Sequence, residues 1–200
     1  MFATPQSEID ALVSHARGAG SLRYAALVPE GPFGDAMSSG LSDALGRVGG
    51  PGVSVVSVVR YPPEATSFGA PAAALANLEF DALLFADRAT QLALIAPALA
   101  AAGLWSGADP KEGRRRALWL APSVAFDASL ARSAGRYLQG AVFSVPFDAE
   151  TAEGTARTFA ERFRAQFRDT PDAFAAFAHD AYRLTRSAVD AGAHTREELA

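Results

Sequence analysis

Short apolar runs alternate with amphipathic segments along most of the chain. The organising stretch is residues 22–45, where an apolar run leads through a proline- and glycine-rich turn into a segment whose apolar side chains recur every four residues from Met37 to Leu45. This spacing predicts a strand, a turn and a helix that lays one apolar stripe on a sheet. Residues 7–19 carry an apolar face too, and predict a preceding helix capped by Ser7.

Further apolar runs have the length and composition of strands. They occupy residues 53–61, 81–86, 117–121 and 141–145. Helical patterns lie at residues 68–78, 91–102 and 126–137, and a polar, exposed loop is expected at 106–116. Strands that alternate with helices favour right-handed crossovers and a parallel sheet covered on both faces. The chain therefore predicts an α/β fold, a doubly wound and mainly parallel sheet of about five strands with flanking helices.

The pattern changes at residue 151, after which two helices follow without a strand between them. Phenylalanine recurs at four-residue spacing from Phe159 to Phe167, and Pro171 is expected to start the second helix. The predicted inner face of that helix consists of Phe174, Phe177, Ala178, Ala181 and Leu184. We predict two domains, an α/β lobe at 1–150 and a C-terminal helical pair at 151–200.

Charge and composition exclude several classes of function. The formal net charge of -4 gives no basic field for nucleic acid, and Lys111 in its KEGRRR run is typical of a solvated loop. Without cysteine there is no disulfide, thiol nucleophile or thiolate-bound zinc. The sequence begins without the basic and apolar regions of a signal peptide, and no apolar run approaches the roughly 20 residues of a membrane span.

The turn between the first strand and its helix is one candidate binding element. Gly31 and Gly34 permit close backbone approach, and a helix N-terminus carries partial positive charge, so the turn can cradle an anion. It lacks the spacing of a dinucleotide fingerprint and the Lys-Ser/Thr of a phosphate loop. A plain tight turn and a ligand-binding turn that includes Gly34 both stay open here. The second of these would suit a nucleotide- or phosphate-using α/β enzyme.

Polar residues directly after two later strands are further candidates. Asp87 and Arg88 follow the third predicted strand, and Ser123 follows the fourth. Because the carboxyl ends of parallel strands share one edge, these side chains are placed to meet the charged ends of a small zwitterion. The alternative is that Asp87 and Ser123 are ordinary helix caps and that Arg88 is solvated.

No catalytic or metal-binding constellation is found. His15, His179 and His194 lack the spacing of metal ligands, and there is no serine nucleophile elbow. His179 and Asp180 are neighbours within a predicted helix, where adjacent side chains diverge, so a structural hydrogen bond is favoured over a catalytic pair. The residues thus point to no catalytic group, cofactor or metal.

The order and spacing of these landmarks resemble the type I periplasmic binding proteins, which include receptors for branched-chain amino acids. The matching pieces are the PFGDAM turn, RYPPEATSF, FDALLFADRATQLALIAPALAAAGL, GAVFSVPFD and FAERFRAQFRDTPDAFAAFAHDAYRL. Within the family, RYPPEAT and LIAPALAAAGLW look closest to lipoprotein activators of penicillin-binding proteins. The resemblance extends over residues 22–192.

The resemblance implies a non-enzymatic ligand-recognition domain of a periplasmic, cell-envelope protein. Its partner would be a small amino acid-like solute, with an ABC permease, or a peptidoglycan synthase. The sequence would supply the second lobe of a two-lobed fold, and residues 151–192 would be helices that return to the first lobe. Without that lobe, their phenylalanine face is expected to pack on the sheet or on another copy of the chain, giving a homo-oligomer.

The resemblance also implies ligand contacts by position. They fall at Phe33, at Asp87 and Arg88, and at Ser123. Phe33 stands where the family has tyrosine, so a hydroxyl that bonds a ligand is missing. His179 stands where tyrosine precedes Asp-Ala.

Overall fold

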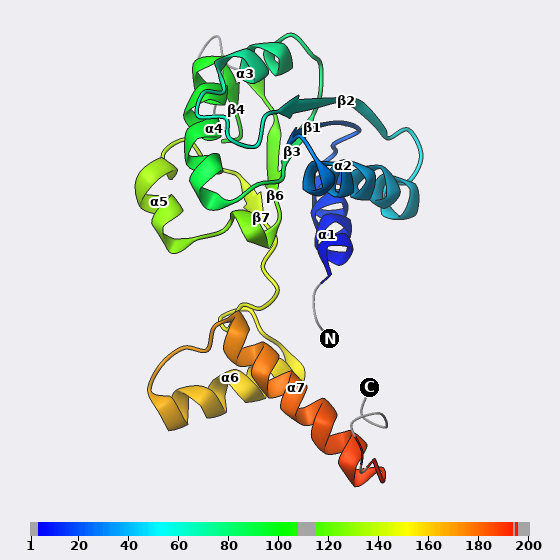
Figure 1. The fold of residues 1–200 in the computed structure, drawn as a ribbon, viewed down its shortest axis with the longest axis vertical. Helices are drawn as coiled ribbons and strands as arrows, with labels where there is room; N and C mark the ends of the chain where they lie inside the picture. Colours follow the sequence, from blue (N-terminus) through cyan, green and yellow to red (C-terminus); the bar gives the residue numbers. More distant parts are fainter. Residues whose placement is uncertain (1–3, 108–114, 194, 196–200) are drawn as a thin grey trace. The chain divides into compact units, whose positions relative to one another are not determined.

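The computed structural model describes residues 4–107, 115–193 and 195. They fall into two compact units, which meet in sequence between Val145 and Pro146. The first unit contains a sheet with helices on both faces, and the second contains a pair of helices (Figure 1).

The first unit is built on a parallel sheet. Its strands are β1 (Arg23–Pro29), β2 (Ser54–Tyr61), β3 (Ala82–Phe85), β6 (Leu118–Ala121) and β7 (Val142–Phe143). The 5-stranded sheet has the order β2-β1-β3-β6-β7, and every neighbouring pair is parallel. The predicted α/β fold with a doubly wound parallel sheet is confirmed.

Side chains that alternate along β1 divide the core into two layers. Tyr24, Ala26 and Val28 belong to the core layer that packs under α1 (Pro5–Gly18) and α2 (Pro32–Ala44). Ala25 and Leu27 belong to the opposite layer, with side chains of α3 (Gly69–Ala76), α4 (Ala89–Ala101) and α5 (Ala128–Ala134). Figure 1 shows the two groups of helices on opposite faces of the sheet. Such double cover explains why β1 and β3 are apolar without alternation.

Several local predictions are corrected by the structure. The first helix is capped by Thr4 rather than Ser7, and the Ser7 hydroxyl completes a capping box as the third helical residue. After α2 the chain continues as one π-helical turn, Leu45–Gly49. The predicted loop at 106–116 is wrong at its end, because β5 (Arg115–Arg116) pairs in parallel with β4 (Leu104–Trp105). The rest of that loop from 108 to 114, including Lys111, lies outside the described residues.

The second unit contains α6 (Gly154–Phe167) and α7 (Ala173–Asp190). Phe159 contacts Phe147 and Phe163 edge to face, and its ring lies 4.4 Å from that of His179. The second helix begins after Pro171, with Asp172 as its N-cap. None of the helices among the described residues is long and apolar enough to span a membrane.

The predicted inner face of α7 is wrong in most of its members. Phe174 and Leu184 are 80% and 61% exposed, and the buried residue of this helix is Ala176. Ala178 and Ala181 are exposed as well, while Phe177 is half-buried. Helical periodicity shows which residues share a face, but the packing of α6 decides which face is covered.

Candidate functional site

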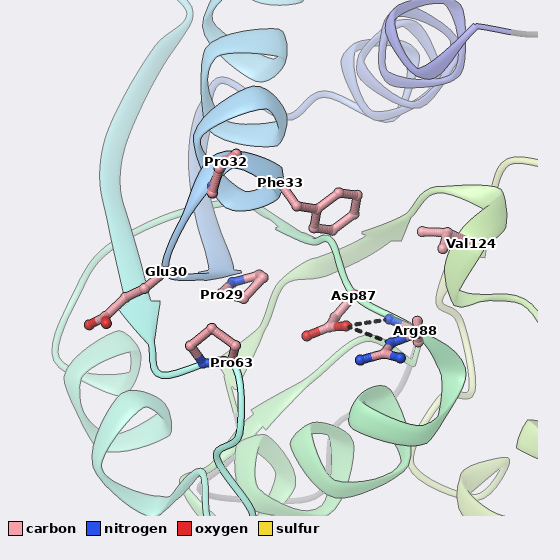
Figure 2. A pocket seen from close by; sticks show the side chains of 8 residues that line it. All are labelled: Pro29, Glu30, Pro32, Phe33, Pro63, Asp87, Arg88 and Val124. Carbon is pink, nitrogen blue, oxygen red and sulfur yellow. Dashed lines mark hydrogen bonds and ion pairs between the residues drawn. The ribbon is translucent and has the colours of Figure 1, made fainter.

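A hollow lies at the carboxyl edge of the sheet, where the strand order changes direction. From β1 the chain crosses to β2 on one side, and then to β3 on the other. In open α/β sheets, ligands bind outside the strand ends at such a switch point. The hollow has a volume of about 380 Å³ and is lined by residues at or after the ends of four strands: Pro29, Glu30, Pro32, Phe33, Pro63, Asp87, Arg88 and Val124 (Figure 2).

The turn after β1 is held tightly by its glycines. Gly31 has a φ of 98°, a conformation that L side chains rarely adopt. A Cβ on Gly34 would lie 1.8 Å from the carbonyl oxygen of Pro29, so only glycine permits this approach of α2 to the strand end. The glycines thereby place Phe33, which is 41% exposed, at the hollow. Gly34 is not among the lining residues.

Asp87 is a buried carboxylate with fixed partners. The Tyr61 hydroxyl donates to its Oδ2 at 2.7 Å, and the backbone N–H of Arg88 donates to Oδ1 at 2.7 Å. Burial first, and then the hydrogen bond and charge of Asp87, raise the pKa of Tyr61 far above its ordinary value. The N-cap of α4 is Arg88, so the alternative interpretation of Asp87 as the helix cap is wrong.

Sequence reasoning missed Tyr61 as part of this site. It is the last residue of β2, 1% exposed, and its ring contacts Phe68 edge to face at 4.9 Å. Its position could have identified it, because Tyr61 is the last residue of a strand that ends before Pro62 and Pro63. A polar residue that ends a strand at this edge is what such a search should include.

Arg88 presents an exposed positive charge at the hollow. Its side chain is 76% exposed, and its Nε lies 3.9 Å from Asp87 Oδ1, beyond hydrogen-bond length. Among the described residues, no other group pairs with this guanidinium. A guanidinium with open donors binds a carboxylate or phosphate in bidentate geometry.

Ser123 is engaged elsewhere. Its backbone N–H and its hydroxyl both donate to the carboxylate of Glu8 at 2.7 Å, and the Ser144 hydroxyl donates to the same group. The following residue, Val124, lines the hollow instead and is 46% exposed. Nor is Ser123 a cap, since Pro122 is the N-cap of the short 3-10 helix Ser123–Ala125. The hollow thus brings together Phe33, Asp87 and Arg88.

A sequence model of the periplasmic binding protein family matches residues 1–200. The chain belongs to this family. The site just described therefore lies at the carboxyl edge of the sheet in a periplasmic binding protein. A comparison with curated proteins finds no match.

Solved structures with the same fold share less than a quarter of the sequence. A leucine-binding protein from Thermotoga maritima is 20% identical, with a TM-score of 0.73 over 99% of this chain and 53% of its own. A leucine-, isoleucine-, valine-, threonine- and alanine-binding protein from Brucella ovis is 15% identical, with a TM-score of 0.76 over 98% of this chain and 47% of its own. A solute-binding protein from R. palustris in complex with benzoate is 19% identical, with a TM-score of 0.67 over 99% of this chain and 52% of its own. The chain spans about half the length of the structures it matches.

Proposed function

We propose that this chain is the solute-recognising lobe of a non-enzymatic receptor, and that the hollow at Arg88 receives the carboxylate of a small solute. One observation carries the proposal: an exposed guanidinium without a hydrogen-bonding partner among the described residues borders an apolar hollow at the sheet's switch point. Asp87 positions the start of α4 by accepting from the Arg88 amide. The amino acid-like solute expected from the sequence belongs to this carboxylate class.

The ligands named for similar structures support a carboxylate. Leucine, benzoate and fatty acids each carry one, and these names belong to proteins that share this fold. Their remaining chemistry differs, from a zwitterion to an aromatic ring and an alkyl chain. What they share is the group that a guanidinium recognises.

In the whole protein we propose that residues 4–145 form the second of two lobes and that α6 and α7 return to the first. Such a receptor works in the periplasm and delivers its solute to an ABC permease. The alternative role, activation of a peptidoglycan synthase through protein contact, stays a prediction of the sequence resemblance.

The charges at the β1 turn argue against the nucleotide-using enzyme. Glu30 precedes α2 and Asp35 lies in its first turn, so acids flank the helix end that a phosphate would need. Asp35 pairs with Arg60 at 2.9 Å, which removes that cation from the turn as well. A phosphate at this helix end would be repelled by these carboxylates, which already complement its partial positive charge.

Calorimetric titration of the chain with leucine and with benzoate tests the proposal. We expect binding of one or both, and a loss of about tenfold in affinity in Arg88→Gln, because the charge-assisted hydrogen bonds disappear. Arg132→Gln on α5 is the matched control, since Arg132 does not line the hollow. Equal binding by wild type and Arg88→Gln would contradict the proposal.

A further inference from the structure

The charged groups that face the hollow are not equally available. The Arg88 guanidinium is 76% exposed, whereas the Asp87 side chain is only 10% exposed. Each carboxylate oxygen of Asp87 already accepts a hydrogen bond of 2.7 Å, one from Tyr61 and one from the Arg88 backbone. A solute therefore meets an open guanidinium and a carboxylate that is nearly enclosed and already hydrogen-bonded at both oxygens.

The other acid of the hollow is poorly placed for a zwitterion. An α-amino acid carries its ammonium and carboxylate on one carbon, so their two partners must be neighbours. In the view of Figure 2, Pro29 and Pro63 lie between Glu30 and Arg88, and the Glu30 carboxylate points away from the other lining side chains. An ammonium beside a carboxylate held by Arg88 would face a guanidinium of like charge, and the neighbouring carboxylate of Asp87 is only 10% exposed and already accepts two hydrogen bonds.

The rest of the lining is apolar. Phe33 and Val124 expose 41% and 46% of their surface, and three prolines complete the wall: Pro29, Pro32 and Pro63. Phe33 offers a ring face without a hydroxyl. Walls of this kind bury carbon rather than a second charged group, since a buried charge without a partner is costly.

We infer that the solute is an organic acid with an apolar body, a carboxylate and no ammonium group beside it. The inference rests on the proposed function and narrows it, because it separates deaminated acids from the amino acids that carry the same carboxylate. Arg88 holds the carboxylate, and Phe33 and Val124 contact the carbon body. The α-carbon of the solute lies near the guanidinium, where an added ammonium is repelled and loses water without compensation.

Matched ligand pairs test this class directly. Leucine and 4-methylpentanoate have the same carbon skeleton and carboxylate and differ in the α-ammonium, as do phenylalanine and 3-phenylpropanoate. We would titrate each into the ¹⁵N-labelled chain and fit the dissociation constants from amide shifts, a method that measures weak binding too. The acid of each pair is expected to bind about tenfold more tightly than its amino acid.

Two variants sharpen the result. Arg88→Gln should lower the affinity for 4-methylpentanoate by about tenfold and remove the preference over leucine. Glu30→Gln should raise that affinity, because it removes a like charge from the rim. Arg132→Gln serves again as the control for a change of arginine outside the hollow.

The outcomes separate the two proposals. Leucine binding as tightly as 4-methylpentanoate, or more tightly, overturns the inference and leaves the solute-binding function standing. If neither member of either pair binds, the proposed function fails and the inference fails with it. A preference for the acid that persists in Arg88→Gln also overturns the inference, since the preference would then come from another group.

Discussion

The two units of this chain contain similar apolar periodicities but bury them very differently. In residues 4–145, large side chains such as Trp119, Tyr24 and Phe85 are almost fully buried between the sheet and its helices. In the helical unit, the buried apolar residues are the small Ala149, Ala160 and Ala176. The larger apolar residues include several that are more than 40% exposed: Phe167, Phe174, Tyr182, Leu184 and Val189. An amphipathic pattern thus indicates a helix, whereas its burial depends on a partner surface.

This difference in burial predicts different effects of substitution on stability. Adding one atom in the α/β unit can destabilise the protein, whereas replacing a whole exposed side chain in the helical unit should change little. In the α/β unit, each core side chain is enclosed on all sides, so added or lost atoms cannot be accommodated cheaply. In the helical unit, several large apolar side chains are exposed already. Substitutions in the two units therefore give a graded series of effects on the free energy of unfolding.

The largest effect is expected from Gly34→Ala. The new Cβ would lie 1.8 Å from the Pro29 carbonyl oxygen, which is backbone and cannot swing away. We expect a loss of about 3 kcal/mol or more in the free energy of unfolding, measured by urea denaturation. Gly69→Ala is the control, because a Cβ there meets nothing within 4 Å. Equal stability of the two variants would contradict the close approach of Gly34 to the Pro29 carbonyl oxygen.

Tyr61→Phe comes next. It removes the hydroxyl that donates to Asp87 and leaves the ring packing in place, so a buried carboxylate oxygen loses its partner. We expect a loss of about 1–3 kcal/mol by the same measurement. Tyr182→Phe in α7, where the tyrosine is 64% exposed, should change stability by less than about 0.5 kcal/mol. If Tyr182→Phe lowers the free energy of unfolding as much as Tyr61→Phe does, the proposed difference in burial between the two units is contradicted.

Alkaline pH should act through the same residue. Burial, followed by Asp87, raises the folded-state pKa of Tyr61 above its unfolded value, so its contribution to stability is complete below pH of about 10 and is lost as pH rises further. Burial also raises the pKa of Tyr24. Each tyrosine adds a slope of up to about 1.4 kcal/mol per pH unit above that point. Urea unfolding between pH of about 9 and 11 should show a steeper decline in wild type than in Tyr61→Phe, and identical slopes would show that Tyr61 ionises freely.

The smallest effect is expected on the exposed face of α7. Phe174→Gln and Leu184→Gln should each change stability by less than about 0.5 kcal/mol, because these side chains are already 80% and 61% exposed. Leu84→Ala in β3, fully buried, is the counterpart and should cost about 2–5 kcal/mol. Light scattering on the same samples tests the alternative, a homo-oligomer formed through this face. A large loss in Phe174→Gln, together with concentration-dependent mass, would show that a second copy covers this face.

Local signals explain which parts of the fold were predictable. The strand, turn and helix at 22–45 follow from apolar runs, turn glycines and four-residue spacing, all of which are near neighbours in sequence. β4 and β5 were missed because two-residue strands have no periodicity to detect. The inner face of α7 was wrong because the choice among its faces is made by α6.

The site was predictable by position but not by partner. Asp87 and Arg88 directly follow a strand, and ligands bind outside the carboxyl ends of the strands in such sheets. Their position in the sequence therefore predicted that they lie at the hollow. The bond from Tyr61 to Asp87 joins residues 26 apart, and the bonds from Ser123 and Ser144 to Glu8 join residues 115 and 136 apart. Such pairings depend on the order of strands in the sheet, which periodicity leaves open.

The most direct test of the central claim, that a carboxylate-bearing solute occupies the hollow at Arg88, is a map of amide chemical shifts as the chain is titrated with 4-methylpentanoate. We predict saturable shifts that centre on the amides of Phe33, Arg88 and Val124 and that vanish in Arg88→Gln. Saturable shifts centred on α6 and α7, or no shifts at all, would contradict it.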